Sequence, residues 1–154
     1  MAKLIKPNVN MGKGFFGIGV DHPKTEENLG TLVRSGKQFG ASFIFTIGHR
    51  YKKEPSAVNL NSKIPIFNFK DWKEFRSTIP DVEIIGVDLT DVSEDLKVFK
   101  HPKSCIYLLG SEDNGLSKLA LENCNKFVKI EGNYSLNVAV AGSIIMYERY
   151  LTFN

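Results

Sequence analysis

The sequence predicts an α/β fold: one domain built on a mostly parallel sheet with helices on both faces. Apolar runs of strand length alternate with segments of helical periodicity, and this alternation is typical of parallel α/β sheets. Residues 105–109 (Cys-Ile-Tyr-Leu-Leu) have no polar alternation, which indicates a strand covered on both faces. At 154 residues the chain has the length of one domain, so we treat residues 1–154 as a single unit.

The composition is that of a globular protein, with 42% hydrophobic and 24% charged residues. No apolar run approaches the ~20 residues that span a bilayer, and the start of the chain lacks the apolar core of a secretory signal. We therefore expect a cytoplasmic protein with no membrane association. Cys105, Cys124 and three scattered histidines fit neither a disulfide framework nor a metal-ligand spacing, so no metal is expected. The net charge of +3 allows a nucleic-acid partner without requiring one.

The predicted strands are apolar runs that end in turn signals. They cover residues 15–20, 43–47, 64–67, 83–89, 105–109 and 126–130. Gly12-x-Gly14-x-x-Gly17, which overlaps the first strand, has the spacing of a dinucleotide-binding loop. Such a loop must follow a strand and precede an acid by about 20 residues. Here it follows a polar stretch, and Lys37 stands where the acid is needed, so we reject a dinucleotide-dependent oxidoreductase.

The first predicted helix begins near Thr25, a good N-cap, and stops at Gly40. Apolar residues between them recur at helical spacing. Gly30 lies inside this helix, where glycine costs about 1 kcal/mol relative to alanine, so we expect another segment to approach the backbone there. Arg34 is either a functional residue or an ordinary solvated arginine.

Two short helices are predicted in the middle of the chain. Asp71 and Glu74 have the spacing of a capping box, and the helix that they begin ends before Pro80. Its aromatic residues, Trp72 and Phe75, are expected in the core. The second short helix follows Leu116.

The terminal helix can be capped by Ser135 or Asn137. It has two apolar stripes, and a helix with two apolar faces is buried on two sides. We expect one stripe against the sheet and the other in a subunit interface, with burial inside one core as the alternative. The first stripe contains Val140, Ile144, Tyr147 and Leu151, and the second contains Ala139, Gly142, Ser143 and Met146.

Residues 110–115 (Gly-Ser-Glu-Asp-Asn-Gly) directly follow the buried strand 105–109. The glycines permit unusual backbone angles, and Asn-Gly is a strong turn signal. In open α/β sheets, ligands bind beyond the carboxyl ends of the strands. We therefore expect a binding site at this loop, and an ordinary strand-to-helix turn is the alternative.

A basic run with one aromatic residue, His49-Arg50-Tyr51-Lys52, follows the strand 43–47. Its cations can bind RNA phosphates while Tyr51 stacks on a base. A solvated loop is the alternative.

Three polar clusters follow one another along the chain. They are Asn28-x-Gly30-x-x-x-Arg34, Gly110-Ser111-Glu112-x-x-Gly115-Leu116 and Ser135-Leu136-Asn137. Their order and spacing closely resemble those of the SpoU family of RNA ribose 2′-O-methyltransferases, in the SPOUT superfamily. The resemblance runs from Phe15 to the end of the chain. It is greatest to the small single-domain members that act on the tRNA anticodon wobble nucleotide.

The resemblance implies features that the residue patterns alone do not indicate. The C-terminal part of the sheet would thread into a deep trefoil knot, which general topology rules disfavour. The knot would form the S-adenosyl-L-methionine pocket of a homodimer that pairs through the C-terminal helix. Catalytic roles are implied for Asn28, Arg34, Glu112 and Ser135. Cofactor contacts are implied for Leu89, Gly110, Glu112, Gly115, Ile130, Ser135, Leu136 and Asn137. RNA contacts are expected from Arg34, His49, Arg50, Tyr51 and Lys52.

The expected reaction is transfer of a methyl group from S-adenosyl-L-methionine to a ribose 2′-OH, with tRNA as the expected RNA. Arginine is effectively always charged, so we expect Arg34 to stabilise the developing alkoxide rather than to act as the base. The alternatives are an rRNA 2′-O-methyltransferase and a catalytically silent RNA-binding protein that retains the fold. The silent alternative is favoured by one departure: relatives usually have Ile-Pro-Met here, whereas Ile130 is followed by Glu131 and Gly132.

Overall fold

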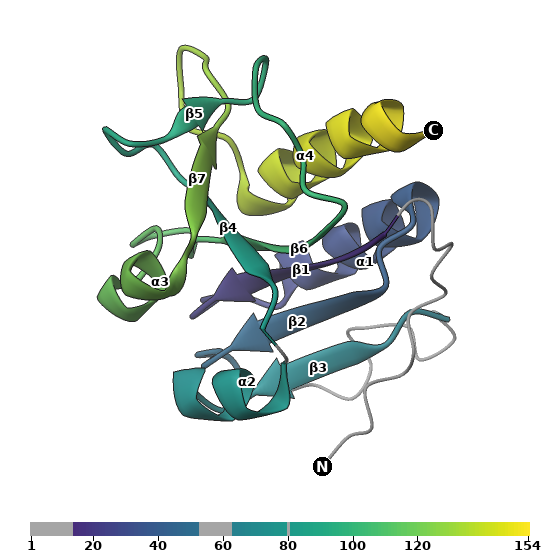
Figure 1. The fold of residues 1–154 in the computed structure, drawn as a ribbon. Helices are drawn as coiled ribbons and strands as arrows, with labels where there is room; N and C mark the ends of the chain where they lie inside the picture. Colours follow the sequence, from purple (N-terminus) through teal and green to yellow (C-terminus); the bar gives the residue numbers. More distant parts are fainter. Residues whose placement is uncertain (1–13, 53–62, 80) are drawn as a thin grey trace.

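The computed structural model describes residues 14–52, 63–79 and 81–154. These residues form one sheet with the strand order β3-β2-β1-β6-β4-β7-β5, and all the paired strands are parallel (Figure 1). The α/β fold with a parallel sheet is therefore confirmed. The strands are β1 Phe15–Asp21, β2 Phe43–Ile47, β3 Ile66–Phe69, β4 Glu83–Val87, β5 Glu94–Asp95, β6 Ser104–Leu109 and β7 Lys126–Lys129.

Helices cover both faces of the sheet, as the sequence predicts (Figure 1). On one face, α1 (Glu27–Phe39) and α4 (Val138–Phe153) pack over an apolar cluster that includes Ile18, Leu32 and Met146. On the other face, α2 (Trp72–Thr78) and α3 (Lys118–Asn123) pack over a second apolar cluster. Trp72 and Phe75 lie in this second cluster, which confirms their assignment to the core.

Strand β6 is the buried strand that the sequence predicts. It lies between β1 and β4, and its residues from Cys105 to Leu109 are at most 2% exposed. Burial raises the pKa of the Cys105 thiol to about 11, so the thiol is a core group at neutral pH. The carboxyl end of β6 therefore sits in the middle of the sheet edge, and the 110–115 loop begins there.

Close packing of α4 on the sheet depends on Gly142. A Cβ at this position would lie 2.6 Å from Leu32 Cδ2 and 2.9 Å from Leu109 Cδ1. Only glycine allows the helix backbone to come this near to both α1 and β6. This contact places the first turn of α4 beside the end of β6.

The carboxyl half of α4 is anchored by a buried polar network. Arg149, 4% exposed, donates hydrogen bonds from its guanidinium to the backbone oxygens of Pro102 and Lys103 and to the Tyr107 hydroxyl. His101 contacts the same hydroxyl through Nδ1, over 2.6 Å, and the Glu148 carboxylate through Nε2. Each buried polar group in this network thus has a partner, as stability requires.

Several local expectations are wrong at element boundaries. The N-cap of α1 is Glu26, not Thr25, and the backbone oxygen of Glu26 accepts a hydrogen bond from the Leu29 N–H. The reason lies in tertiary structure: the preceding Lys24 N–H is bound by the distant Glu112 carboxylate, which sets where the helix starts. Gly40 ends α1 with a φ of +85°, as predicted.

The close approach expected at Gly30 is also not found. Within residues 14–52, 63–79 and 81–154, no atom outside the local helix lies within 4 Å of a Cβ built at Gly30. The residue faces open space in the single chain, so its helix cost is not compensated by packing among the described residues.

Two strands differ from their predicted bounds by more than one residue, one beside a proline and one beside a polar residue. Strand β3 begins at Ile66, two residues later than predicted, because Pro65 has no N–H to donate to the ladder. Strand β4 ends at Val87, because the Asp88 carboxylate turns back to accept the Leu89 N–H. The two-residue strand β5 is polar and was not predicted.

No helix within the described ranges has the length and apolar character needed to cross a membrane. Gly12, part of the rejected dinucleotide motif, and Pro80 lie outside the described residues. The deep trefoil knot stays a prediction from the family resemblance.

Candidate functional site

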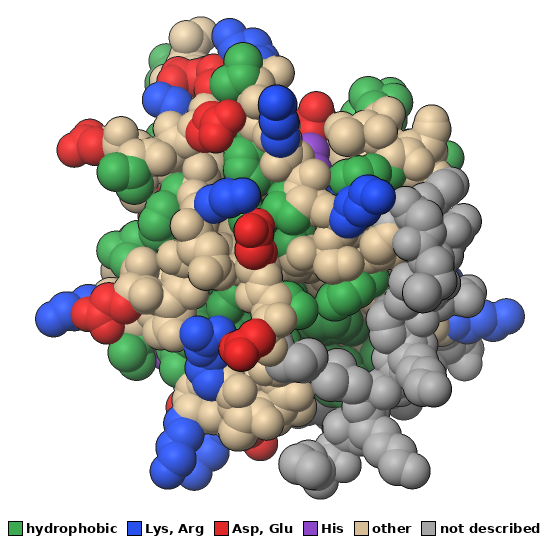
Figure 2. Space-filling view, in the orientation of Figure 1, with side chains coloured by type: hydrophobic (Ala, Val, Ile, Leu, Met, Phe, Trp, Pro, Cys, Tyr) green, Lys and Arg blue, Asp and Glu red, His purple; other side chains and the backbone are tan. Residues whose placement is uncertain are grey.

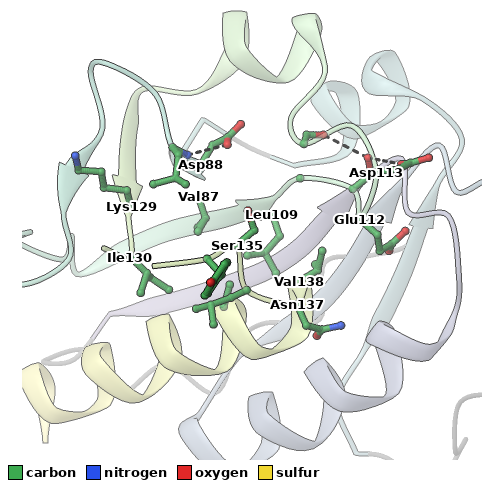
Figure 3. A pocket seen from close by; sticks show the side chains of 17 residues that line it. Val87, Asp88, Leu109, Glu112, Asp113, Lys129, Ile130, Ser135, Asn137 and Val138 are labelled. Carbon is green, nitrogen blue, oxygen red and sulfur yellow. Dashed lines mark hydrogen bonds between the residues drawn. The ribbon is translucent and has the colours of Figure 1, made fainter. Parts of the chain in front are cut away.

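A cavity of about 550 Å³ lies where β4, β6 and β7 end. Its walls are the loops that follow these three strands, together with the first turn of α4 (Figure 3). This is the carboxyl edge of the sheet, where the sequence predicted a site beside the 110–115 loop. All the residues that the family resemblance assigned to the cofactor line this cavity: Leu89, Gly110, Glu112, Gly115, Ile130, Ser135, Leu136 and Asn137.

The three sequence clusters meet at one end of the cavity through hydrogen bonds. The Asn28 amide donates to Glu112 Oε1 over 3.2 Å, and the Asn137 amide donates to Asn28 Oδ1 over 3.0 Å. Asn28 is 8% exposed, so these bonds satisfy an amide that is nearly removed from water. Asn28 thus joins the loop after β6 to the start of α4.

Glu112 is held from both sides. Its Oε2 accepts the Lys24 backbone N–H over 2.8 Å, while Oε1 accepts from Asn28. Figure 3 shows the Glu112 side chain at the end of the cavity where Asn137 also lies. A carboxylate with two donors is fixed in position.

The helix cap is resolved in favour of Asn137. Its side-chain oxygen accepts the N–H groups of Ala139 and Val140, over 2.9 and 3.2 Å. Ser135, the other possible cap, lines the cavity two residues earlier and is exposed. Capping therefore leaves the Ser135 hydroxyl facing the cavity.

The 110–115 loop folds tightly back on itself. Ser111 and Gly115 exchange backbone hydrogen bonds, and Gly115 has a φ of +66°. A Cβ at Gly110 would lie 2.4 Å from the Gly115 carbonyl carbon, so only glycine fits there. The loop is a compact wall of the cavity rather than an open turn.

The structure adds residues to the cavity that the sequence interpretation missed. Asp88 and Lys129 lie at the end opposite Glu112 (Figure 3). Asp88 was predicted inside the strand 83–89, whereas the structure ends β4 at Val87 and so places this acid directly after the strand. Lys129 pairs with Glu131 at 2.7 Å, and this bond raises the pKa of the lysine. Tyr134 also lines the cavity and is 91% exposed, and nothing in the sequence distinguished it from an ordinary loop tyrosine.

Arg34 is not brought to the cavity within the single chain. Its side chain is exposed on α1, and it is not among the lining residues. The catalytic set of the sequence interpretation is therefore split, because Asn28, Glu112 and Ser135 lie together and Arg34 lies apart.

The basic loop after β2 is partly engaged within the protein. The Tyr51 ring stacks on His49 with ring centroids 4.5 Å apart, and burial raises the Tyr51 pKa to about 12. Arg50 forms an ion pair with Asp113 of the cavity loop. Lys52 is exposed. Figure 2 shows acidic and basic side chains interspersed on the face that it presents.

No group of three or more His, Cys, Asp or Glu residues within the described ranges is placed to hold a metal ion. The polar side chains that line the cavity carry carboxylates, hydroxyls, one amide and one ammonium group: Asp88, Ser111, Glu112, Asp113, Lys129, Tyr134, Ser135 and Asn137.

Curated proteins of similar sequence match this chain over more than four fifths of its length. The 23S rRNA (uridine(2479)-2′-O)-methyltransferase of Streptomyces viridochromogenes is 28% identical over 151 residues, covering 87% of this chain and 52% of the relative. An uncharacterized tRNA/rRNA methyltransferase of Borreliella burgdorferi is 26% identical, covering 86% of this chain and 62% of the relative. The chain thus spans about half to two thirds of the length of these relatives.

Solved structures share the fold. The SpoU methyltransferase AviRb from Streptomyces viridochromogenes, in complex with AdoMet, superposes with a TM-score of 0.78 at 24% identity, covering 91% of this chain and 58% of AviRb. A structure that concerns 2-OH methylation of C/U34 on tRNA superposes with a TM-score of 0.76 at 21% identity. That match covers 92% of this chain and 99% of the other.

A family model matches residues 16–147, which include the three motif clusters and the whole cavity. The chain therefore belongs to the SpoU rRNA methylase family.

Proposed function

We propose that this protein transfers a methyl group from S-adenosyl-L-methionine to a ribose 2′-OH of RNA. One observation carries the proposal: the residues that the family motifs assign to the cofactor line a single cavity, and Asn28, Glu112 and Asn137 are hydrogen-bonded at its end. AdoMet is bound by the similar SpoU methyltransferase AviRb and by a similar rRNA methyltransferase from Sinorhizobium meliloti.

The cavity has the properties that this cofactor needs. Its volume lies within the range of small-molecule sites, roughly 300–1,000 Å³. Leu89, Ile130 and Leu136 supply apolar surface for an adenine ring, and Asp88 supplies a carboxylate for ribose hydroxyls. A Cβ at Gly115 would lie 3.4 Å from Asp88 Oδ2, so the loop after β6 and the end of β4 lie close together at this point.

When bound, the cofactor supplies a sulfonium methyl group that an oxygen nucleophile attacks in line. The protein positions the reactants and stabilises charge on the ribose oxygen. Glu112, fixed by Lys24 and Asn28, and the Ser135 hydroxyl orient the reacting groups in the cavity. Arg34 stabilises the developing alkoxide and binds a phosphate, and a phosphate oxygen or water accepts the proton.

The proposal includes a homodimer that pairs through α4. The first apolar stripe of this helix is exposed in the single chain: Val140 43%, Ile144 36%, Tyr147 51% and Leu151 59%. Burying such a continuous stripe in a second copy removes it from water. Because Arg34 lies outside the cavity of its own chain, RNA bound across two subunits brings the reacting ribose to both Arg34 and a cavity.

We propose tRNA as the substrate, with the anticodon wobble nucleotide as the first position to test. The support is the similar length of the two chains. The match to the structure that concerns 2-OH methylation of C/U34 on tRNA covers 92% of this chain and 99% of that chain. In this proposal His49, Tyr51 and Lys52 contact the RNA. An rRNA 2′-O position is the second candidate, because one sequence relative, from Streptomyces viridochromogenes, is a 23S rRNA methyltransferase whose name states the nucleotide.

Mass spectrometry of ribose-methylated nucleosides, in tRNA and rRNA separated from cells with and without this protein, tests the proposal. We expect one 2′-O-methylated nucleoside to disappear from tRNA and to return when the wild-type gene is restored. Loss from rRNA alone supports the second candidate.

The silent alternative is tested with the purified protein. We expect saturable binding of S-adenosylhomocysteine by calorimetry and a rise in the unfolding temperature on binding. Absence of binding together with an unchanged nucleoside profile contradicts the enzyme proposal.

A further inference from the structure

The cavity loop between β6 and α3 is held by residues from the ends of two other strands. The buried Asp21 carboxylate at the end of β1 accepts the Ser117 N–H through Oδ2, over 2.8 Å. The Lys24 N–H binds Glu112 in the middle of the loop. Between these two contacts, Arg50 from the segment after β2 forms an ion pair with Asp113. The loop therefore has three anchors spaced along its length.

The Arg50–Asp113 contact is a two-point pairing. Arg50 Nη1 donates to Asp113 Oδ2 over 3.0 Å, and Nη2 donates to Asp113 Oδ1 over 2.6 Å. The same carboxylate accepts from the Ser111 hydroxyl over 3.1 Å. A planar guanidinium facing a planar carboxylate fixes orientation as well as distance. Asp113 is thus held against its own loop and against the end of β2.

Arg50 also holds the segment that binds Glu112. Its Nε donates to the His22 backbone oxygen over 3.0 Å, and its backbone N–H donates to the Pro23 oxygen over 2.9 Å. The next residue, Lys24, supplies the N–H that binds Glu112. Arg50 therefore contacts both partners of the Lys24–Glu112 pair: its Nε and backbone N–H bind the segment that donates, and its Nη1 and Nη2 bind the loop that accepts.

The backbone beside this contact is held in an uncommon conformation. His22 has a φ of +51°, a backbone angle that residues other than glycine rarely adopt. The surrounding bonds impose it: the His22 N–H donates to the Ile47 oxygen over 2.7 Å, and Nδ1 contacts Asp21 Oδ1 over 2.7 Å. Such backbone persists only where neighbouring contacts over-determine it, and Arg50 is one of them.

We propose that Arg50 is a positioning residue, which sets the orientation of Glu112 and the cavity loop through Asp113, His22 and Pro23, rather than a contact to RNA phosphate. This inference rests on the proposed methyltransferase function for its activity readouts. Arg50 Nε donates to the His22 backbone oxygen, and Nη1 and Nη2 donate to the Asp113 carboxylate. A phosphate that pairs with the guanidinium through the Nη1 and Nη2 N–H groups that bind Asp113 has to displace that carboxylate.

The charge state of the pair is constant through the pH range of most assays. The hydrogen bond from Arg50 holds the pKa of the Asp113 carboxyl well below its usual range, and Asp113 raises the pKa of Arg50. Both groups are charged at neutral pH, so their mutual orientation does not vary with pH there.

The test compares Arg50→Ala with Lys52→Ala, a change of an exposed cation in the same segment. For each variant, S-adenosylhomocysteine affinity, RNA affinity at several salt concentrations, and kcat and KM are measured. A misplaced loop lowers kcat/KM by about ten- to a hundred-fold for Arg50→Ala, with a weaker cofactor affinity. RNA affinity and its salt slope remain near the wild-type values. Lys52→Ala lowers RNA affinity and leaves cofactor affinity unchanged.

A double-mutant cycle with Asp113→Ala supplies the second readout. If Arg50 acts through Asp113, the effects of Arg50→Ala and Asp113→Ala on cofactor affinity are non-additive. Arg50→Lys keeps the charge but loses the two-point pairing, so its cofactor affinity is expected to lie between those of the wild type and Arg50→Ala. Additive effects, or unchanged cofactor affinity in Arg50→Ala with a salt slope reduced by about one, overturn the proposal.

Amide hydrogen exchange in residues 110–117 tests the positioning role of Arg50 without relying on the proposed methyltransferase activity. We expect faster exchange in this loop for Arg50→Ala and an unchanged rate in β6. If the wild type neither binds S-adenosylhomocysteine nor methylates RNA, the function proposal fails and the exchange result alone decides the role of Arg50. An unchanged exchange rate in the loop overturns the positioning role.

Discussion

The side-chain amide of Asn137 donates a hydrogen bond to the side-chain oxygen of Asn28, which lies 109 residues earlier in the chain, over 3.0 Å. Asn28 in turn donates to Glu112 over 3.2 Å. These two bonds connect the start of α1, the loop after β6 and the start of α4. Three motifs that are far apart in the sequence thereby form one end of one cavity.

The two functions of Asn137 can be separated by substitution. Asn137→Asp keeps an oxygen that caps Ala139 and Val140 but removes the N–H that binds Asn28. We expect Asn137→Ala to lower the free energy of unfolding by about 1 kcal/mol, because the cap is lost. Asn137→Asp should keep most of that stability and yet weaken S-adenosylhomocysteine binding. Urea unfolding and calorimetry measure the two effects, and wild-type affinity in Asn137→Asp would show that the bond to Asn28 is dispensable.

Two helical glycines should respond to alanine in opposite directions. In Gly142→Ala the new Cβ meets Leu32 and Leu109 at less than contact distance, so we expect a loss of about 1–3 kcal/mol in unfolding free energy. In Gly30→Ala the Cβ points into open space, so we expect a gain of about 0.4–1 kcal/mol. Urea unfolding of both variants measures the difference. A destabilised Gly30→Ala would mean that a second subunit packs against this position.

Arg34→Ala should abolish RNA methylation and leave S-adenosylhomocysteine affinity unchanged, because Arg34 lies outside the cavity. Arg34→Lys keeps the positive charge but loses the planar donor arrangement, so partial activity is expected. Single-turnover methylation assays and calorimetry on the same preparations measure the two properties. An equal loss of cofactor binding in Arg34→Ala is the result that rejects the assigned role.

Acid should destabilise the protein through His101. Burial lowers the pKa of His101 from its usual value, although the Glu148 carboxylate opposes this shift. As the pH falls below about 6.5, the unfolded chain binds a proton that the folded chain does not, so unfolding becomes easier. One such proton contributes at most about 1.4 kcal/mol per pH unit.

Urea unfolding between pH 5 and 8 measures this dependence, and His101→Gln, which cannot titrate, serves as the matched control. We expect the variant to lack part of the acid-induced loss seen in the wild type. Identical slopes in the two proteins would place the pH dependence in other groups.

Both thiols should be unreactive while the protein is folded. Burial raises the pKa of Cys105 to about 11 and that of Cys124 to about 12, and the thiolate is the reactive form. We expect slow labelling of both by a thiol-specific disulfide reagent at pH 8, and rapid labelling of both in denaturant. Fast labelling of either thiol in the native protein would contradict its burial.

Local patterns were sufficient for the elements that depend on nearby residues. The apolar run at 105–109 predicted a doubly covered strand, and the spacing of Asp71 and Glu74 predicted a capped helix: the Glu74 N–H donates to Asp71 over 2.9 Å. One stripe of the terminal helix was predicted to pack on the sheet, and Ala139 and Met146 are buried there, whereas the subunit interface predicted for the other stripe stays a prediction. In each case the signal is a period or a cap within a few residues.

Other features were wrong or missed because distant residues decide them. The N-cap of α1 is Glu26 rather than Thr25, beside the Lys24 N–H that the distant Glu112 accepts. The partner of Arg50 is Asp113, 63 residues later, which no local pattern indicates.

The sequence by itself determined the fold class, the buried strand β6, the motif clusters and, through those motifs, part of the cavity lining. Only the tertiary structure decided which of them touch. The physical reason is the strand order: β1 lies between β2 and β6, so the loops after these three strands meet at one edge of the sheet. Hydrophobic periodicity along the chain says nothing about which strands become neighbours. The contacts of Glu112 with Lys24 and of Arg50 with Asp113 follow from that order.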